Sequence, residues 1–398
     1  MNTLGVYIQI PFCGSKCSFC NFSSQVARDD AIGRHCQALE REIAEWDSLA
    51  TSAGIASATL SLPVDTVYIG GGTPPIVGAE RLKRIVAKLR ERFEVEARCE
   101  FTLEVTPASA DEDFLTRLRD WGANRLSIGA QSFSDPELRA VGRLHSAADT
   151  HETVARARRA GFSNISLDLI AGLPGQTEFS WQESLRAVEC LRPEHVSVYI
   201  IEMDEKSRLG REVLRHGERY HASEVPDENF MADAYECARD FLAAAGYRQY
   251  EISNFALPGL ESRHNRKYWR LEPYLGFGAG AHSFDGEWRW ANEISSESYA
   301  QRVTRGEAPA TEIRRLTTQD QIEEFFFLGL RQAEGVDLAE ARGRWGNSSL
   351  GRWESVIAGF AGRGLLVREN DRIRLPDSAL LVSNEVFQEF LLTEMEAQ

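Results

Sequence analysis

The feature that most constrains the fold of this chain is the alternation of short strand patterns with longer helical patterns in its first half. Between the short β-branched runs, apolar residues recur at helical spacing, as they do over residues 82–93. Parallel strands are expected, because a right-handed crossover places each intervening helix on the outer face of the sheet. The six candidate strands are residues 5–10, 65–69, 100–105, 125–128, 164–169 and 195–200.

Six strand–helix units are fewer than the eight that close a full barrel. The sequence therefore predicts an α/β fold built around a partial, open (β/α)6 barrel. In folds of this class, ligands bind at the carboxyl ends of the parallel strands. Residues that end or follow each strand are accordingly the first candidates for a functional site.

A capping-box pattern marks the start of one of the helices. Ser109 is followed three residues later by Glu112, a spacing at which the two side chains can cap each other's backbone N–H groups. Gly122 then stands where a left-handed residue would end the helix. We therefore expect a helix that begins at Ser109 and ends at Gly122.

The pattern changes after about residue 240, and a chain of 398 residues has room for two or three domains of about 150 residues. The next segment is rich in glycine and aromatic residues. A helical pattern then resumes near Thr317, and Asn370-Asp371 gives a hairpin signal. Helices followed by a hairpin predict a small winged-helix-like domain. We predict a barrel domain, an aromatic extension and this C-terminal domain at residues 1–240, 241–305 and 306–398.

Composition and charge exclude some classes of function. The chain has 60 acidic and 45 basic side chains, and this net charge of −15 argues against nucleic acid as a partner, because phosphate binding needs a basic surface. No apolar run approaches the roughly 18 residues of a transmembrane segment, although peripheral membrane contact stays open. No signal-peptide pattern precedes the first strand, and three of the seven cysteines are clustered. Clustered thiols are typical of a reducing compartment, so we expect a cytoplasmic location.

The clustered cysteines lie on the loop after the first strand, where Cys13, Cys17 and Cys20 are separated by three and then two residues. Three thiolates on a short loop can hold three corners of a [4Fe–4S] cluster and leave one iron open to a small molecule. The alternative is a zinc site with His35 as the fourth ligand. Zinc loops usually come as two paired knuckles, and this sequence has no second pair, so the spacing favours the cluster.

Glycines and polar residues end or follow several of the other predicted strands. The run 70–73 (Gly-Gly-Gly-Thr) would let the backbone approach a ligand closely, but it could also be a plain tight turn. Glu104, Gln131, Arg143 and Asp168 lie at or after the ends of successive strands. Each could bind a ligand or could be a hydrogen-bonded polar group of the core. The residues alone leave both interpretations open.

The run 7–13 (Tyr-Ile-Gln-Ile-Pro-Phe-Cys), together with the spacing of the three cysteines, resembles the radical S-adenosylmethionine (SAM) superfamily and, within it, the coproporphyrinogen III oxidase-like branch. The resemblance implies that the cysteines hold a [4Fe–4S] cluster whose open iron binds SAM. It further implies SAM contacts at Tyr7, Phe19, Gly71, Gly72, Thr73, Glu104, Gln131, Arg143 and Asp168.

Two features are similar to the haem chaperones of that branch. Phe22 stands where the oxygen-independent coproporphyrinogen III oxidases carry a further cysteine, and His264 begins the motif His-Asn-x-x-Tyr-Trp. The resemblance implies that haem is the cargo, that His264 is a candidate haem ligand, and that haem is delivered to acceptors such as respiratory cytochromes. A packed aromatic cluster around a hydrogen-bonded histidine is the alternative for the motif. A coproporphyrinogen III oxidase, or another tetrapyrrole-modifying radical SAM enzyme, is the alternative for the function, so whether the chain is an enzyme stays open.

Overall fold

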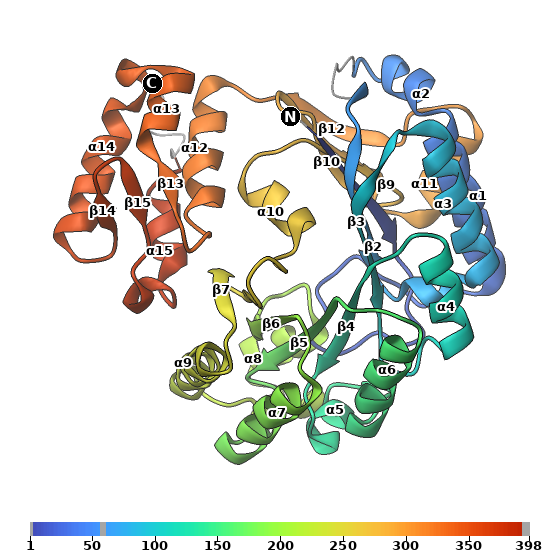
Figure 1. Cartoon of the computed structure of the whole chain (residues 1–398), viewed down its shortest axis with the longest axis horizontal. Helices are drawn as coiled ribbons and strands as arrows, with labels where there is room; N and C mark the ends of the chain where they lie inside the picture. The colour runs from blue at the N-terminus through green and yellow to red at the C-terminus, as the bar shows by residue number, and fades with distance from the viewer. Residues whose placement is uncertain (1–2, 56–60, 392–398) are drawn as a thin grey trace.

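The computed structural model describes residues 3–55 and 61–391, which form a large α/β unit and a smaller C-terminal unit (Figure 1). The apolar core of the large unit extends along the chain from Leu4 to Ala310. The smaller unit has a core of its own, from Ile322 to Phe390. The last part of the predicted C-terminal domain, residues 392–398, lies outside the described residues.

The six predicted strands are present, and they run parallel and side by side in chain order, which confirms the predicted α/β fold. Most are longer than the sequence pattern suggests. The strands are β1 (Leu4–Ile10), β2 (Val64–Gly71), β3 (Val95–Val105), β4 (Arg125–Gln131), β5 (Ile165–Ala171) and β6 (His195–Ile200).

Helices between these strands cover the outer, convex face of the curved sheet (Figure 1). The sheet does not close into a barrel, because its two edge strands, which lie after β6 in the sequence, are not paired with each other. The helical elements of this part are α1 (Asp29–Ala44), α2 (Trp46–Ser52), η2 (Pro74–Val77), α3 (Ala79–Arg92), α4 (Glu112–Asp120), α5 (Asp135–Ala140), α6 (Ala147–Arg159), α7 (Glu178–Leu191), α8 (Arg208–Leu214), η3 (Arg219–Glu224) and α9 (Glu228–Ala244).

The segment 241–305 and the residues just after it add strands to both edges of the same sheet. Two of them extend the sheet beyond β6 and four extend it beyond β1, in the order β12-β11-β10-β9-β1-β2-β3-β4-β5-β6-β8-β7. Helix α10 lies in the opening of the curved sheet (Figure 1). The division into three domains stays a prediction. The elements are β7 (Arg248–Glu251), β8 (Asn254–Ala256), α10 (Arg263–Trp269), β9 (Tyr274–Phe277), β10 (His282–Phe284), β11 (Trp288–Asn292), α11 (Ser296–Thr304) and β12 (Ala310–Arg315).

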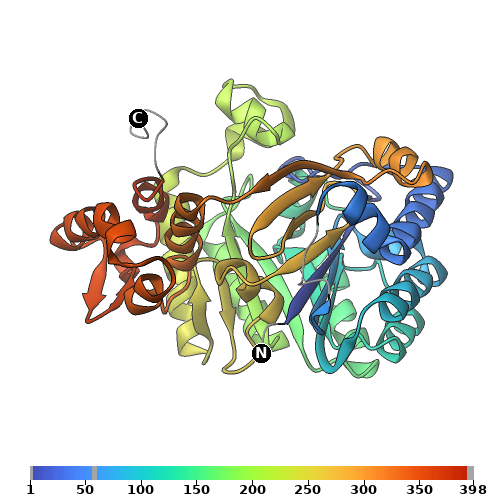
Figure 2. The same cartoon turned by 90° about the horizontal axis from the view of Figure 1, so that it is seen from above.

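The C-terminal unit lies beside the sheet and combines helices with a small three-stranded sheet (Figure 2). Its hairpin turns at Asn370, which adopts the left-handed conformation (φ 56°), so the hairpin signal in the sequence is confirmed. The elements are α12 (Thr318–Gly329), β13 (Val336–Asp337), α13 (Leu338–Trp345), α14 (Asn347–Gly362), β14 (Val367–Glu369), β15 (Arg372–Arg374), η4 (Asp377–Ala379) and α15 (Ser383–Gln388).

The parallel strands have an apolar outer face and a polar inner face. In β4, Leu126 and Ile128 pack into the core, whereas Arg125 and Ser127 face the inside of the barrel. Successive side chains of a strand point to opposite faces, so this alternation gives the barrel a polar interior. Neighbouring strands contribute inward-facing polar residues in the same way, namely Tyr68, Glu104, Ser166, Asp168, His195 and Ser197.

The start of α4 differs from the expected capping box. The cap is Asp111, whose carboxylate accepts a hydrogen bond from the backbone N–H of Phe114 at 2.8 Å. Ser109 instead donates to the carbonyl of Thr106 at 2.6 Å, within the turn that follows β3. Serine and aspartate are both favoured as N-terminal caps. Here Ser109 belongs to the turn after β3, so the helix begins later and Asp111 caps it.

Across the described part of the chain, every helix is too short or too polar to cross a membrane.

Candidate functional site

A cavity of about 750 Å³ opens at the carboxyl ends of the parallel strands, where the barrel fold predicts a site. Its size is typical of pockets that bind small molecules or cofactors. The loop over residues 13–24 and the turn over residues 71–73 form part of its mouth, and the inner faces of β3 to β6 form its walls.

The residues proposed from the sequence as cluster ligands or SAM contacts all line this cavity except Tyr7, and the candidate haem ligand His264 does not line it. They come from six different loops or strands, and the fold brings them together because these segments meet at the same edge of the sheet. The residues that line it are Cys13, Cys17, Phe19, Cys20, Gly71, Gly72, Thr73, Glu104, Gln131, Arg143 and Asp168.

Contacts within the loop help to hold the cysteines in place. The ammonium of Lys16 donates to the carbonyls of Phe22 and Ser24, at 3.1 and 3.0 Å. The backbone N–H of Cys13 donates to the carbonyl of Gln25 at 3.0 Å. These bonds close the loop while they leave the three cysteine side chains half-buried and facing the cavity.

The donor set of this loop fits an iron–sulfur cluster. Cys13, Cys17 and Cys20 are free thiols. Removal from water raises the pKa of Cys13, and the neighbouring thiols of Cys20 and Cys17 raise it further, against hydrogen bonds from Ser24 and Thr73 that lower it. Three soft thiols gathered around one cavity are the ligands that such a cluster uses, and their deprotonation would accompany its binding.

The zinc alternative lacks its proposed fourth ligand. His35 is fully buried in α1, where its ring packs against Phe12 and Tyr299 and its Nδ1 lies 3.1 Å from the hydroxyl of Ser296. It does not line the cavity. In the described ranges, moreover, no three His, Cys, Asp or Glu side chains are grouped closely enough to hold one metal ion. Thiolates that bind separate irons of a cubane lie further apart than the ligands of one zinc ion, so the arrangement is compatible with a cluster.

Glu104 lies under the glycine turn. Its carboxylate accepts hydrogen bonds from the hydroxyl of Tyr68 at 2.8 Å and from the backbone N–H of Gly71 at 2.9 Å. A Cβ atom at Gly70 would come within 2.7 Å of the same carboxylate, so a larger residue there would displace Glu104. The low-dielectric surroundings raise the pKa of Glu104 to about 7, although these two hydrogen bonds oppose the shift.

On the opposite side of the cavity, Arg143 connects the end of β4 to the cysteine loop. Its Nη1 lies 3.7 Å from the sulfur of Cys17, and its Nη2 donates to the carbonyl of Gly129. Its Nε is buried without a hydrogen-bond partner. Asp168 faces the same space from β5, and desolvation raises its pKa to about 6. The site therefore offers both a cation and weakly acidic carboxyl groups.

Tyr7 and His264 do not line the cavity, and both pack against Tyr68, which does. The ring of Tyr68 stacks on that of Tyr7, with centroids 5.9 Å apart, and on that of His264, at 5.3 Å. Both imidazole nitrogens of His264 form hydrogen bonds, Nδ1 with the hydroxyl of Thr66 at 2.9 Å and Nε2 with that of Tyr268 at 2.8 Å. Burial lowers the pKa of His264 to about 3, so the ring is neutral. In this arrangement neither nitrogen is free to bind iron.

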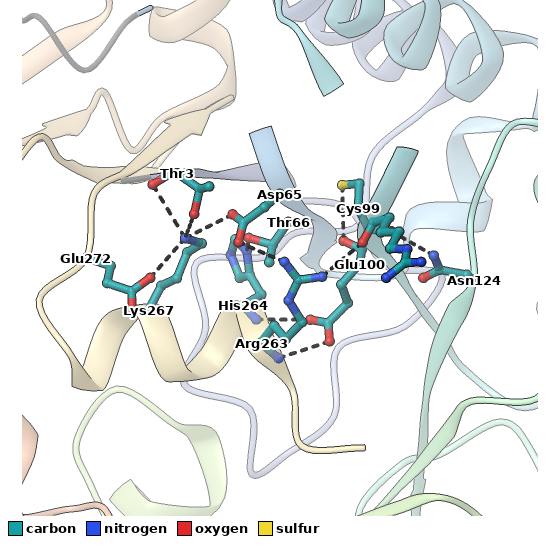
Figure 3. Close-up of polar contacts among 11 residues, drawn as sticks. Thr3, Asp65, Thr66, Cys99, Glu100, Asn124, Arg263, His264, Lys267 and Glu272 are labelled. Carbon is teal, nitrogen blue, oxygen red and sulfur yellow. Dashed lines mark hydrogen bonds and ion pairs between the residues drawn. The ribbon is translucent and has the colours of Figure 1, made fainter. Parts of the chain in front are cut away.

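Polar contacts anchor α10, the helix that carries His264, to the amino ends of the strands (Figure 3). Glu100 accepts hydrogen bonds from the backbone N–H groups of Arg263 and His264, at 2.9 and 3.0 Å. The ammonium of Lys267, which is only 2% exposed, pairs with Asp65 at 2.9 Å. The motif that begins at His264 therefore closes the lower end of the barrel.

Several cavity residues were not identified from the sequence. They are the inward-facing polar residues within the strands, and the available signal was polar residues at alternate positions of otherwise apolar strands. Such positions can equally face solvent, so the pattern alone does not place them in a site. These residues are Tyr68, Arg125, Ser127, Ser166, His195 and Ser197.

Comparison with known families identifies the two units. The radical SAM superfamily matches residues 7–188, and the HemN C-terminal domain matches residues 316–382. Among solved structures, coproporphyrinogen III oxidase (HemN) from Escherichia coli, a radical SAM enzyme, superposes with a TM-score of 0.84 at 25% identity, over 98% of this chain and 90% of that chain.

Curated relatives extend the match to nearly the full length. The heme chaperone HemW of Bacillus subtilis is 36% identical over 97% of this chain and 98% of its own length. HemW of Lactococcus lactis is 32% identical over 98% of this chain and 97% of its own. With the fold and the cysteine-lined cavity also in agreement, this chain belongs to the radical SAM superfamily and, within it, to the HemW family.

Proposed function

We propose that this protein is a haem chaperone that binds a [4Fe–4S] cluster, SAM and haem, and that it delivers haem to acceptor proteins such as respiratory cytochromes in the cytoplasm. The observation that carries the proposal is the near-full-length similarity to proteins named heme chaperone HemW. The cavity supports it, because three free thiols and a set of polar groups face one space of about 750 Å³.

In this proposal the cluster and SAM occupy the mouth and walls of the cavity. Cys13, Cys17 and Cys20 hold the cluster, which when bound can supply an electron to SAM. The glycine turn lets SAM approach the backbone of residues 71–73. The carboxylate of Glu104, placed by Tyr68 and Gly71, is available to the positively charged or hydroxyl groups of SAM. Phe19, Gln131, Arg143 and Asp168, together with Tyr7, complete the proposed SAM contacts.

Two regions could receive haem. Large apolar side chains of Phe22, Leu144 and Tyr199 are exposed at the cavity mouth, and an apolar rim suits the face of a tetrapyrrole. His264 is the candidate iron ligand from the sequence, and for that role α10 would have to move so that one imidazole nitrogen is released. We keep His264 as a proposed ligand on this condition.

Haem transfer is the direct test. Purified, cluster-loaded protein is expected to take up haem and to pass it to an apo-cytochrome, followed by the absorbance of the acceptor. A protein that binds no haem, or that never releases it to any acceptor, contradicts the proposal. A His264→Ala variant that keeps full haem affinity would remove His264 from the site without affecting the chaperone proposal.

The second candidate is an oxygen-independent coproporphyrinogen III oxidase, which the structural similarity to HemN favours. Anaerobic incubation of the reduced protein with SAM and coproporphyrinogen III would then yield protoporphyrinogen IX. We expect no conversion. Several turnovers per cluster would instead identify the protein as the enzyme.

A further inference from the structure

Arg125 is a buried cation at the floor of the cavity. It is the first residue of β4, its side chain is 1% exposed, and it lines the same cavity as the three cysteines. Its Nε has no hydrogen-bond partner. Within the described residues, the guanidinium forms neither a hydrogen bond nor an ion pair with any other side chain or carbonyl.

The groups around Arg125 do not neutralise it. Each carboxylate oxygen of Glu104 accepts one hydrogen bond, from Tyr68 or from Gly71, and neither forms an ion pair with Arg125. Desolvation raises the pKa of Glu104 to about 7 and that of Asp168 to about 6, and the charge of Arg125 opposes these shifts only in part. A carboxylate paired with arginine has a pKa below its usual value. These two residues are therefore neighbours of Arg125 rather than its partners.

The remaining polar groups of the floor bond to one another. His195 connects the hydroxyl of Ser166, 2.8 Å from its Nδ1, to the hydroxyl of Tyr250, 2.9 Å from its Nε2. Burial and the charge of Arg125 lower the pKa of His195 well below its usual value, so the three hydrogen-bonded side chains carry no charge. The floor of the cavity thus contains a neutral hydrogen-bonded group of side chains, centred on His195, beside the unpaired positive charge of Arg125.

An unpaired buried guanidinium is costly, because it cannot release its proton and has lost much of its hydration. Its five N–H donors are arranged to bind a carboxylate through two parallel hydrogen bonds. A cavity that keeps such a group unpaired in the ligand-free protein has a place prepared for an anionic group of a ligand.

We propose that Arg125 forms a subsite that binds a carboxylate of a ligand in the cavity. The inference deepens the proposed function and rests on it, because both ligands named there carry carboxylates: SAM on its methionyl end and haem on its two propionates. The position of Arg125 indicates that the bound group is a carboxylate. Pairs of ligands that differ only in that carboxylate show whether it belongs to SAM or to haem.

The test compares Arg125→Gln with the unaltered protein, both loaded with cluster under anaerobic conditions. Affinities are measured for haem and haem dimethyl ester, and for SAM and decarboxylated SAM. Arg125→Gln is expected to weaken binding of one acid form by about 30-fold or more, the effect of removing one member of a buried charge pair. Binding of the matching ligand without the carboxylate is expected to change little. Arg125→Lys, which keeps the charge, should recover part of the loss.

The outcomes distinguish the possible sources. A loss confined to haem assigns the subsite to a propionate, and a loss confined to SAM assigns it to the methionyl carboxylate. Equal effects on acid and non-acid forms, or no effect on either pair, overturn the inference. If the unaltered protein binds no haem, the proposed function fails, while the SAM pair still tests the subsite.

Two further variants separate binding from folding. Arg289 is a largely buried arginine outside the cavity, paired with Glu324 at 2.7 Å, so Arg289→Gln should leave both ligand pairs unchanged. Arg125→Met should give the ligand-free protein a melting temperature equal to or above the original, because it removes an unpaired buried charge. A large fall in melting temperature would instead assign Arg125 a structural role and contradict the inference.

Discussion

The two motifs that stand out in the sequence, the cysteine loop and helix α10, differ in how far the protein itself satisfies their chemical groups. The thiols of Cys13, Cys17 and Cys20 form no disulfide, have only long hydrogen bonds such as that of Cys17 with Arg143 at 3.7 Å, and face a cavity. In α10, His264 has hydrogen bonds at both nitrogens, and Lys267 is buried in an ion pair. One motif is open to a ligand, whereas the other is occupied by contacts within the fold.

This difference shows that a motif's residue types do not by themselves say whether it binds a ligand or closes the structure. Free groups at the end of a barrel can give their full interaction energy to a ligand. Groups that are already bonded must first exchange those bonds, and that cost is subtracted from the affinity. Variants in the two motifs should therefore affect different properties.

The largest effect is expected from the cysteine loop. Replacing Cys13, Cys17 or Cys20 with serine removes one of three ligands and should abolish nearly all cluster binding, measured as iron content and visible absorbance after anaerobic reconstitution. The fold should persist, because no disulfide involves these residues. Cys190→Ser is the matched control, since this thiol is exposed on α7 away from the cavity. Retention of the cluster in all three variants would contradict the assignment of the loop.

In α10 the expected loss is in stability. Lys267→Met replaces a 2% exposed ammonium by an apolar side chain of similar length. Among the described residues it leaves the buried Asp65 with Arg263 as its one ion-pair partner. Breaking a buried pair from one side costs about 3 kcal/mol of unfolding free energy, measurable by urea denaturation. Cluster content should not change. Lys88→Met, which breaks the exposed pair with Glu91 on α3, is the control and should leave the urea midpoint nearly unchanged. Equal midpoints for the two variants would contradict a closing role for α10.

A similar contrast, between local patterns and contacts distant in sequence, explains which parts of the fold the sequence could predict. The six parallel strands were predictable because their outer faces, such as Leu126 and Ile128 in β4, form compact apolar runs. The strands from β7 to β12 gave no clear pattern, because they are short and their stability comes from partners distant in sequence. Strand β9, for example, pairs in parallel with β1, about 270 residues earlier.

The residues of the site likewise fall into those that the sequence could predict and those that it could not. The cysteines and the polar residues at strand ends were predictable, because spacing and position after a strand are local properties. Arg125 was not, since the cavity that surrounds it is built with residues of four other strands, β2, β3, β5 and β6. Likewise, the occupied state of His264 depends on Thr66 in a distant strand. Sequence can identify a motif, but contacts between distant segments decide whether its groups are free.

A third prediction concerns the pH dependence of SAM binding. Glu104, with a pKa raised to about 7, and Asp168, at about 6, are largely protonated at pH 5 and ionised at pH 8. SAM carries positive charge, so its affinity should rise by about tenfold over this range. The ligand-free protein should show the opposite trend, because a raised pKa adds stability at low pH that is lost as the pH rises through 7.

Isothermal titration at a series of pH values measures the SAM profile. Glu104→Gln should remove the part of the rise near pH 7 and leave the part near pH 6, which belongs to Asp168. A profile in the unaltered protein that is flat from pH 5 to 8 would contradict the placement of SAM beside these carboxyl groups.

The smallest expected effect tests whether the open and the closed motif are connected. Tyr68 contacts both, because its hydroxyl donates to Glu104 at 2.8 Å and its ring stacks on His264. Tyr68→Phe keeps the ring and removes a hydrogen bond that lowers the pKa of Glu104, so the midpoint of the SAM profile should move upward by about one pH unit. Thr66→Val breaks a bond of His264 without altering any contact of Glu104, and should leave the midpoint where it is. If Thr66→Val moves the midpoint as far as Tyr68→Phe does, α10 and the cavity act as one unit, and the separation between an open and a closed motif fails at Tyr68.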